Sequence, residues 1–193
     1  MRLHGLRRGG RSDRPYRRAP RRRSRRADEG ARALTGPILP VSAEDLGWVH
    51  ALNKAHEVEL SQLTPGALAA LVGGATYAHT ADGGAFLIAF DQSAVYDSPN
   101  FLWHRARFET FLYVDRIAVA ETHRRRGLAA LLYNDLFAFA AARGDERIVA
   151  EVNSDPPNPA SDAFHERLGF ETVGEARLEG RGKTVRYLAR ELG

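Results

Sequence analysis

The chain has 193 residues, 44% of them hydrophobic, a formal net charge of +4 and no cysteine. Its length and apolar content suit one globular domain, and the lack of cysteine excludes disulfides, a thiolate nucleophile and zinc sites built on sulfur ligands. It has no apolar run of about 18 residues for a membrane helix and no signal-peptide core near its start, so we expect a cytoplasmic protein without a membrane partner.

Residues 1–34 carry most of the positive charge. They hold thirteen arginines against three acidic residues, whereas residues 35–193 hold fifteen basic and twenty-one acidic residues. With few large apolar residues, the segment 1–34 is predicted to be disordered. Three interpretations compete: a basic arm that binds nucleic acid, a transit peptide, or untranslated leader DNA that is read as protein because the start codon is assigned too far upstream. We favour the last, because Tyr16 is the one aromatic residue of the segment and single-strand binders interleave several. Nucleic acid is therefore not an expected partner.

The first half of the body contains a predicted strand, two helices and two further strands. Apolar residues recur at helical spacing after Ser42, which suits a helix N-cap. Thr64 followed by Pro65 marks the start of the second helix, and Asp82-Gly83-Gly84 predicts a hairpin. The predicted elements are the strand 38–41, the helices 42–59 and 64–74, and the strands 75–79 and 85–90.

The connection 91–110 is long for a link between two strands. It contains several aromatic residues, which argues against disorder. We interpret it as a lid or wall over a substrate. A packed loop, or an extension of a strand by residues 101–107, is an equal alternative.

The segment 113–129, YVDRIAVAETHRRRGLA, combines a strand, a basic turn with one glycine and the start of a helix. The first N–H groups of a helix lack internal partners, and the helix dipole favours negative charge there. Gly127 allows close backbone approach, and the arginines add forked, permanently charged donors. The pattern therefore predicts a site for an anion such as a phosphate.

The second half of the body continues with a helix over 126–143, stopped by Gly144. A β-branched strand at 147–153 follows, so this unit is a right-handed parallel crossover. Asn158 caps another helix that Gly169 ends. A final hairpin, 171–176 and 184–191, completes a mixed α/β sheet fold of order β-α-α-β-β-β-α-β-α-β-β.

The basic turn resembles the pyrophosphate loop of the GNAT acetyltransferases. The pattern of that loop, Arg/Gln-x-x-Gly-x-Gly/Ala, is filled by Arg124, Gly127 and Ala129. Basic glycine turns are common, so on this match alone we favour a solvated charge run before a surface helix. A second segment, NPASDAFHERLGF at 158–170, also resembles the family. Its order and separation from the first motif match as well.

This second segment departs from the family at one place. The family has an asparagine, a small residue three positions later and an apolar-Tyr pair after that, and here Asn158, Ser161 and Phe164-His165 fill these positions. His165 stands where the family usually has Tyr. The resemblance implies the GNAT fold, acetyl-CoA as the donor and a primary amine as the acceptor, a small molecule or a peptide. We expect no metal, since the seven histidines lack metal-ligand spacing, and we leave the oligomeric state open, with a homodimer as one alternative.

The resemblance also implies which residues bind acetyl-CoA. The pantetheine arm adds to the open edge of the strand 113–119, which splays from the next strand. A backbone N–H near Val119 polarises the thioester carbonyl. The expected cofactor-binding residues are Ile117, Ala118, Val119, Arg124, Arg125, Arg126, Gly127, Leu128, Ala129, Asn153 and Asn158.

The catalytic candidates are Asp115 and His165. Asp115 alternates with Ile117 and Val119 along the strand, so it is expected on their face as a base for the amine. An ion pair of Asp115 with Arg116 or with another arginine is an equal alternative. Glu57, Glu109 and a water relay are rival bases. His165 is the expected proton donor to the leaving thiolate, in its imidazolium form.

The acceptor side is expected at the first helix and at the long connection. The candidate substrate residues are Asn53, His56, Glu57, Tyr96, Asn100 and Trp103. A solvated helix surface is the alternative for the first three. Two other functions stay open for the whole chain: a catalytically silent acyl-CoA-binding module, and a basic-arm nucleic-acid binder with a GNAT-like body.

Overall fold

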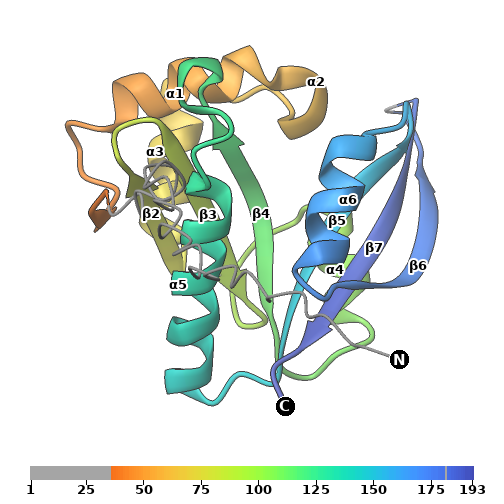
Figure 1. Ribbon diagram of the computed structural model, residues 1–193. Coiled ribbons are helices and arrows are strands. Elements are labelled where there is room, and N and C mark those ends of the chain that lie inside the picture. Colours follow the sequence, from red (N-terminus) through yellow and green to blue (C-terminus); the bar gives the residue numbers. More distant parts are fainter. Residues whose placement is uncertain (1–35, 181) are drawn as a thin grey trace, which may run out of the picture. The chain divides into compact units, whose positions relative to one another are not determined.

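The structure is a computed structural model that describes residues 36–180 and 182–193; the predicted disordered segment 1–34 lies outside the described residues. The described part is a mixed α/β domain (Figure 1). Its strands are β1 Ile38–Pro40, β2 Tyr77–Ala81, β3 Ala85–Asp91, β4 Leu112–Val119, β5 Arg147–Asp155, β6 Glu171–Leu178 and β7 Lys183–Glu191. Its helices are α1 Leu46–Ala55, α2 Glu57–Leu60, α3 Pro65–Gly74, α4 Pro99–Arg105, the 3-10 turn η1 Glu121–His123, α5 Leu128–Arg143 and α6 Pro159–Arg167.

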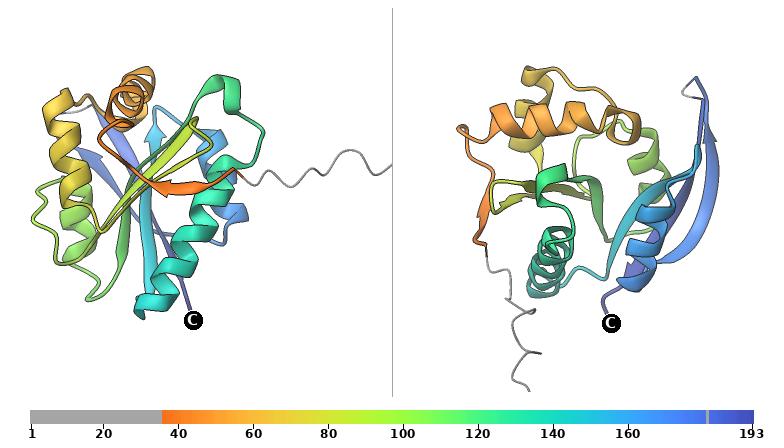
Figure 2. Two further views of the ribbon diagram at one scale, coloured as in Figure 1. Left: turned by 90° about the vertical axis from the view of Figure 1, so that its left-hand side faces the viewer. Right: turned by 45° about the horizontal axis from the view of Figure 1, so that its top comes forward.

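The strands form one sheet in the order β1-β2-β3-β4-β5-β7-β6. Neighbours are antiparallel except β4 and β5, which are parallel and pair only at Leu112 with Ile148 and at Tyr113 with Val149. Beyond these two pairs the strands diverge, so that the sheet opens between them (Figures 1 and 2). This opening places the functional site.

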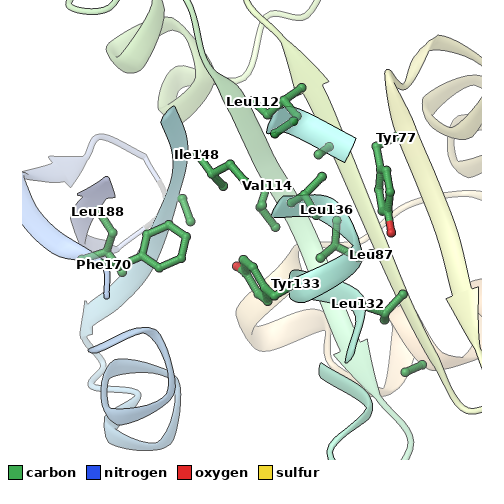
Figure 3. Close-up of a cluster of buried hydrophobic side chains, with 14 of the residues drawn as sticks. Tyr77, Leu87, Leu112, Val114, Leu132, Tyr133, Leu136, Ile148, Phe170 and Leu188 are labelled. Atoms are coloured by element: carbon green, nitrogen blue, oxygen red, sulfur yellow. The ribbon is translucent and has the colours of Figure 1, made fainter. Parts of the chain in front are cut away.

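Helices cover both faces of the sheet. One face, here called the α5 face, carries α5 and α6, and the other, the α1 face, carries α1, α3 and α4 (Figures 1 and 2). A buried cluster fills the α5 face and joins Leu132, Tyr133 and Leu136 to the sheet (Figure 3). A second cluster on the α1 face contains Val49 and Phe101. Each fully buried side chain of this size contributes about 1.5–3 kcal/mol to stability, so the two clusters hold the helices to the sheet.

Local signals in the sequence account for the ends of several helices. Thr64 Oγ1 accepts from the backbone N–H of Ala67 at 3.1 Å, and Pro65 occupies the first turn of α3. Gly144 ends α5 in the left-handed conformation, at φ 80°. These ends are as predicted, because capping and left-handed glycines are local properties of the chain.

Two predictions about the first half are wrong. The helix expected over 42–59 is broken at His56 into α1 and α2, and Asp45, not Ser42, is its N-cap. The connection 91–110 contains the helix α4 where a loop or a strand extension was expected. Ser98 before Pro99 is a helix start of the same kind as Thr64-Pro65, so the signal for α4 was present. No helix of the described residues is both long and apolar enough to cross a membrane.

Candidate active site

A cleft of about 470 Å³ passes through the sheet where β4 and β5 diverge. Its lining comes from both faces. Tyr133 and His165 border it from the α5 face, while Tyr96 and Asn100 border it from the α1 face. The cleft can therefore receive two molecules from opposite faces, and they would meet between the strands.

A β-bulge in β4 sets which side chains face each way. Val114 pairs with Ala89 and Arg116 pairs with Ile88, so Asp115 is the extra residue. Because of the bulge, Val114 and Ile117 both pack on the α5 face although they are three positions apart. A bulge of this kind interrupts the alternation of a strand. Asp115 therefore does not share the face of Ile117 as expected.

Asp115 instead belongs to a buried network on the α1 face. Its Oδ2 accepts from Arg116 Nε at 2.6 Å, and its Oδ1 accepts from the Tyr96 hydroxyl at 2.7 Å. Arg116 also donates to Asn53 Oδ1 at 2.7 Å, and Asn53 donates to the carbonyl of Ser61. Both charged side chains are 5% exposed. The structure therefore shows Asp115 in an ion pair with Arg116, the alternative to a role as base.

Asp115 lines the cleft from this network, and a second buried carboxyl group, that of Glu151 on β5, lines it as well. Asn100 Nδ2 donates to its Oε1 at 2.7 Å and the Tyr113 hydroxyl donates to the same atom at 3.0 Å. The other oxygen, Oε2, is buried and has no hydrogen-bond partner among the described residues. Burial raises the pKa of Glu151 to about 8, and the negative charge of Asp115 acts in the same direction.

This carboxyl group is a proton acceptor with a suitable pKa. Both donors bind Oε1, so the proton of the neutral acid resides on the buried Oε2 of Glu151. A base is most effective when its pKa lies near the working pH. The sequence reasoning missed Glu151; its one signal was a charged residue within the otherwise apolar run Ile148–Val152.

His165 borders the cleft, but its ring is held as a neutral imidazole. Nδ1 lies 2.8 Å from the backbone oxygen of Ser161, and because a carbonyl can only accept, Nδ1 carries the hydrogen. Nε2 then accepts from the Tyr133 hydroxyl at 2.8 Å. Burial lowers the pKa of His165 below its ordinary value. An imidazolium donor, as expected from the sequence, does not suit this environment.

The basic turn has the geometry of an anion site. Arg125 has φ 60° and Gly127 has φ 77°, and left-handed residues of this kind are typical of turns whose backbone N–H groups bind anions. Gly127 is the N-cap of α5, and no side chain caps the free N–H groups there. Arg124 and Arg125 are exposed and make no salt bridge within residues 36–180 and 182–193. A phosphate fits this arrangement.

The side chains of several other predicted cofactor residues contact the rest of the protein. Arg126 is bound to Asp82 in the β2–β3 turn, so its charge is partly neutralised. Leu128 is buried in the cluster of the α5 face, and thus offers a ligand only its backbone, as Ala129 next to it can. Asn158 caps α6 by accepting from the N–H of Ser161 at 3.1 Å, and its own N–H binds the carbonyl of Asn153.

These two asparagines and β4 border the cleft. Asn153, Asn158 and Ile117 line it, and Ala118 and Val119 continue the same strand. Beyond Tyr113, β4 pairs with no described strand on its β5 side. An extended arm can add to such an edge by backbone hydrogen bonds.

The predicted substrate residues are divided by the structure. Tyr96 and Asn100 line the cleft, but both are bound to carboxylates, Asp115 and Glu151. Asn53 lies behind the cleft and holds Arg116. These three residues position charged groups.

The remaining candidates do not line the cleft. His56 lies 4.0 Å from Glu59, and Glu57 accepts from Gln62 at 3.0 Å. Trp103 stacks on Tyr187, with ring centroids 3.9 Å apart, under the β6–β7 hairpin. The rival base Glu109 is exposed and does not border the cleft either. In the described part of the chain, no group of three or more His, Cys, Asp or Glu residues is arranged to hold a metal ion.

Comparisons with known proteins give a family and a shared fold. Residues 68–170 match a sequence model of the Acetyltransferase (GNAT) family. A search of curated protein sequences finds no match.

Solved structures of low sequence identity share the fold. Ard1 from Thermoplasma volcanium superposes with a TM-score of 0.64 at 17% identity, covering 81% of this chain and 97% of that one. The ribosomal-protein-S18-alanine N-acetyltransferase from Escherichia coli gives 0.59 at 19% identity, with 81% and 94% covered. NAA60 from Arabidopsis thaliana, in complex with a bisubstrate analogue, gives 0.64 at 17% identity, with 81% and 98% covered.

Proposed function

This chain belongs to the GNAT acetyltransferase family, a family of acetyl-CoA-dependent N-acetyltransferases, and we propose that it transfers the acetyl group directly to a primary amine with Glu151 as the base. The observation that carries the proposal is the Glu151 carboxyl group in the through-sheet cleft, with a free oxygen and a pKa of about 8. Direct transfer follows because the chain has no cysteine to carry an acetyl group.

The two faces of the cleft suit the two substrates. The donor enters from the α5 face, where the Arg124–Ala129 turn holds its phosphates and the free edge of β4 holds its pantetheine arm. The acceptor enters from the α1 face, past Tyr96 and Asp97. The thioester carbonyl then lies between the diverging strands, where backbone N–H groups of β4 can stabilise the oxyanion.

The reaction requires the acceptor ammonium to lose a proton first. Glu151 Oε2 accepts this proton, and the neutral amine attacks the thioester carbon. The C–S bond breaks, the electron pair stays on sulfur, and the nitrogen loses its second proton to solvent. Asn100 and Tyr113 keep Oε1 occupied, so Oε2 is the oxygen that holds the proton.

The pKa of the base and the charge of the acceptor side indicate the kind of amine. A base with a pKa of about 8 is matched to an α-amino group, whose pKa is about 7.7–8.0, and poorly matched to a lysine side chain at about 10.4. Glu59 and Asp97 add negative charge at the exposed rim of the acceptor side. We infer a preference for cationic α-amines, in amino acids or at peptide N-termini.

The test is acetylation of an amine panel, measured by release of free CoA. The panel contains peptides with a free α-amine, the same peptides with a blocked N-terminus and one lysine, and simple alkylamines. We expect turnover with the α-amines. A protein that binds acetyl-CoA but acetylates no amine would instead support the catalytically silent module, and turnover confined to the lysine peptides would refute the α-amine preference.

A further inference from the structure

We propose that Tyr133 donates a hydrogen bond to the sulfur that leaves acetyl-CoA, and that His165 holds the Tyr133 hydroxyl in position for it. The inference rests on the proposed function, since it concerns the leaving group of that reaction. It moves the donor from α6, where the sequence suggested His165, to α5.

Tyr133 reaches the cleft from the second turn of α5. Its ring is buried at 0% exposure among Phe164, Phe170 and their neighbours, so its position is fixed by packing. Its hydroxyl points from α5 toward the β5 side of the opening (Figure 3). The residue lines the cleft on the face where the CoA arm is proposed to lie.

The partners of the cleft tyrosines distinguish Tyr133 from the others. Among the described residues that line the cleft, three are tyrosines. Tyr96 and Tyr113 donate to the carboxyl groups of Asp115 and Glu151. Tyr133 donates to the neutral Nε2 of His165.

That difference decides which hydroxyl can turn toward a new acceptor. Hydrogen bonds to charged groups are roughly twice as strong as bonds between neutral groups. A thiolate is therefore a stronger acceptor for the Tyr133 hydroxyl than the neutral imidazole, whereas it has no such advantage over the carboxylate of Asp115, which holds Tyr96. Tyr113 is excluded by its place, because it belongs to the buried cluster of the α1 face, opposite the face proposed for the CoA arm. His165 cannot turn instead, because its Nδ1–H is tied to the Ser161 carbonyl at 2.8 Å.

Tyr133 and Glu151 approach the cleft from opposite faces. Glu151 is bound to residues of the α1 face, and Tyr133 belongs to the cluster of the α5 face. Burial raises the pKa of the Tyr133 hydroxyl, and the charge of Glu151 acts in the same direction. The proton acceptor for the amine and the hydrogen-bond donor for the sulfur thus lie on the two sides of one reacting centre.

The proposed step leaves all protons accounted for. When the C–S bond breaks, sulfur keeps the electron pair, and the Tyr133 O–H turns from His165 Nε2 to the thiolate. Tyr133 keeps its proton, since its raised pKa makes it a donor of a hydrogen bond and not of the proton itself. The thiolate leaves as such, or takes a proton from solvent.

The first test uses CoA alone and does not depend on an acceptor. The ultraviolet absorbance of the thiolate is titrated with pH for CoA bound to the wild type and to Tyr133→Phe. We expect the thiol of bound CoA to have a pKa about one unit higher in the variant, a tenfold loss of thiolate preference. Identical titrations in the two folded complexes would overturn the proposal, while leaving the role of Glu151 untouched.

The second test measures the reaction itself. In Tyr133→Phe we expect kcat to fall on the order of 10- to 100-fold, with KM for acetyl-CoA within about twofold. Tyr77→Phe is the matched control, because Tyr77 is also buried on the α5 face but donates to Asp135 outside the cleft. It should keep wild-type kcat. A Tyr133→Phe enzyme with wild-type kcat and an unshifted thiol titration refutes the proposal; a wild type that acetylates no amine, yet shows the shift, refutes only the proposed function.

Discussion

Tyr113 and Glu151 are joined across the point where β4 and β5 part. Tyr113 is the last residue of β4 with a partner on β5, and its hydroxyl donates to Glu151 Oε1 at 3.0 Å. Glu151 lies two residues beyond that last pair, on the open part of β5. The divergence of the strands exposes this carboxyl group to the cleft, while Tyr113 and Asn100 fix its orientation. One local interruption of the sheet thus creates both the cleft and its base.

Replacing Glu151 by Gln should remove the base and its pH dependence. In the wild type we expect kcat/KM to rise with pH up to about 8, because Glu151 must lose its proton before it can accept another. In Glu151→Gln, kcat/KM should fall by about 10²–10⁴-fold, and this limb of the profile should vanish. A variant that keeps both the rate and the limb would assign the base elsewhere.

Measuring the stability of Glu151→Gln will distinguish a loss of catalysis from unfolding of the variant. The folded pKa of Glu151 is raised, so the fold holds a proton that the unfolded chain releases between about pH 4.5 and 8. The contribution of Glu151 to stability is therefore complete below about pH 4.5 and is lost as pH rises through 8. At pH 8, Glu151→Gln should unfold at the same or a higher Tm than the wild type.

Gly127→Ala should weaken CoA binding because a side chain would stand where the phosphate approaches. Gly127 has φ 77° and Gly144, at the other end of α5, has φ 80°; an added Cβ meets no heavy atom within 4 Å at either place. Both substitutions should cost about 1 kcal/mol of stability through left-handed strain. Calorimetric titration should show weaker binding for Gly127→Ala only. Equal affinities would remove the turn from the phosphate site.

Asp115→Asn should lower the free energy of unfolding of the domain. It leaves the buried guanidinium of Arg116 without its counter-charge, and breaking a buried pair costs about 3–5 kcal/mol. Glu191→Gln is the control, since Glu191 pairs with Arg147 but its side chain is 64% exposed; that change should cost under about 1 kcal/mol. Urea unfolding measures both. If Asp115→Asn is as stable as the wild type, the ion pair with Arg116 does not stabilise the fold.

His104→Phe should make the domain more resistant to acid. His104 is fully buried among aromatic rings, and burial lowers its pKa to about 3. Below about pH 6.5, His104 binds a proton in the unfolded chain but stays neutral in the folded protein. The free energy of unfolding therefore falls as the pH drops from 6.5 toward 3. Phe removes this loss without leaving a cavity. Chemical denaturation between pH 7 and 4 should show a shallower decline for the variant; parallel declines would contradict it.

The sequence by itself determined the fold and indicated the family. Helix caps such as Thr64, glycine stops such as Gly144, and the strand–turn–helix unit around Gly127 are local features, and local features can be read from neighbouring residues. The two motifs and their spacing were enough to indicate the family, which the match over residues 68–170 confirms.

Only the tertiary structure decided which polar groups meet. The bulge turns Asp115 away from Ile117, the opening of the sheet exposes Glu151, and α5 brings Tyr133 to His165, 32 positions away in the chain. These relationships depend on pairing between strands and on packing between helices, so no spacing along the sequence records them. The ionisation of Glu151 and His165 follows from burial, which also arises only when the chain is folded.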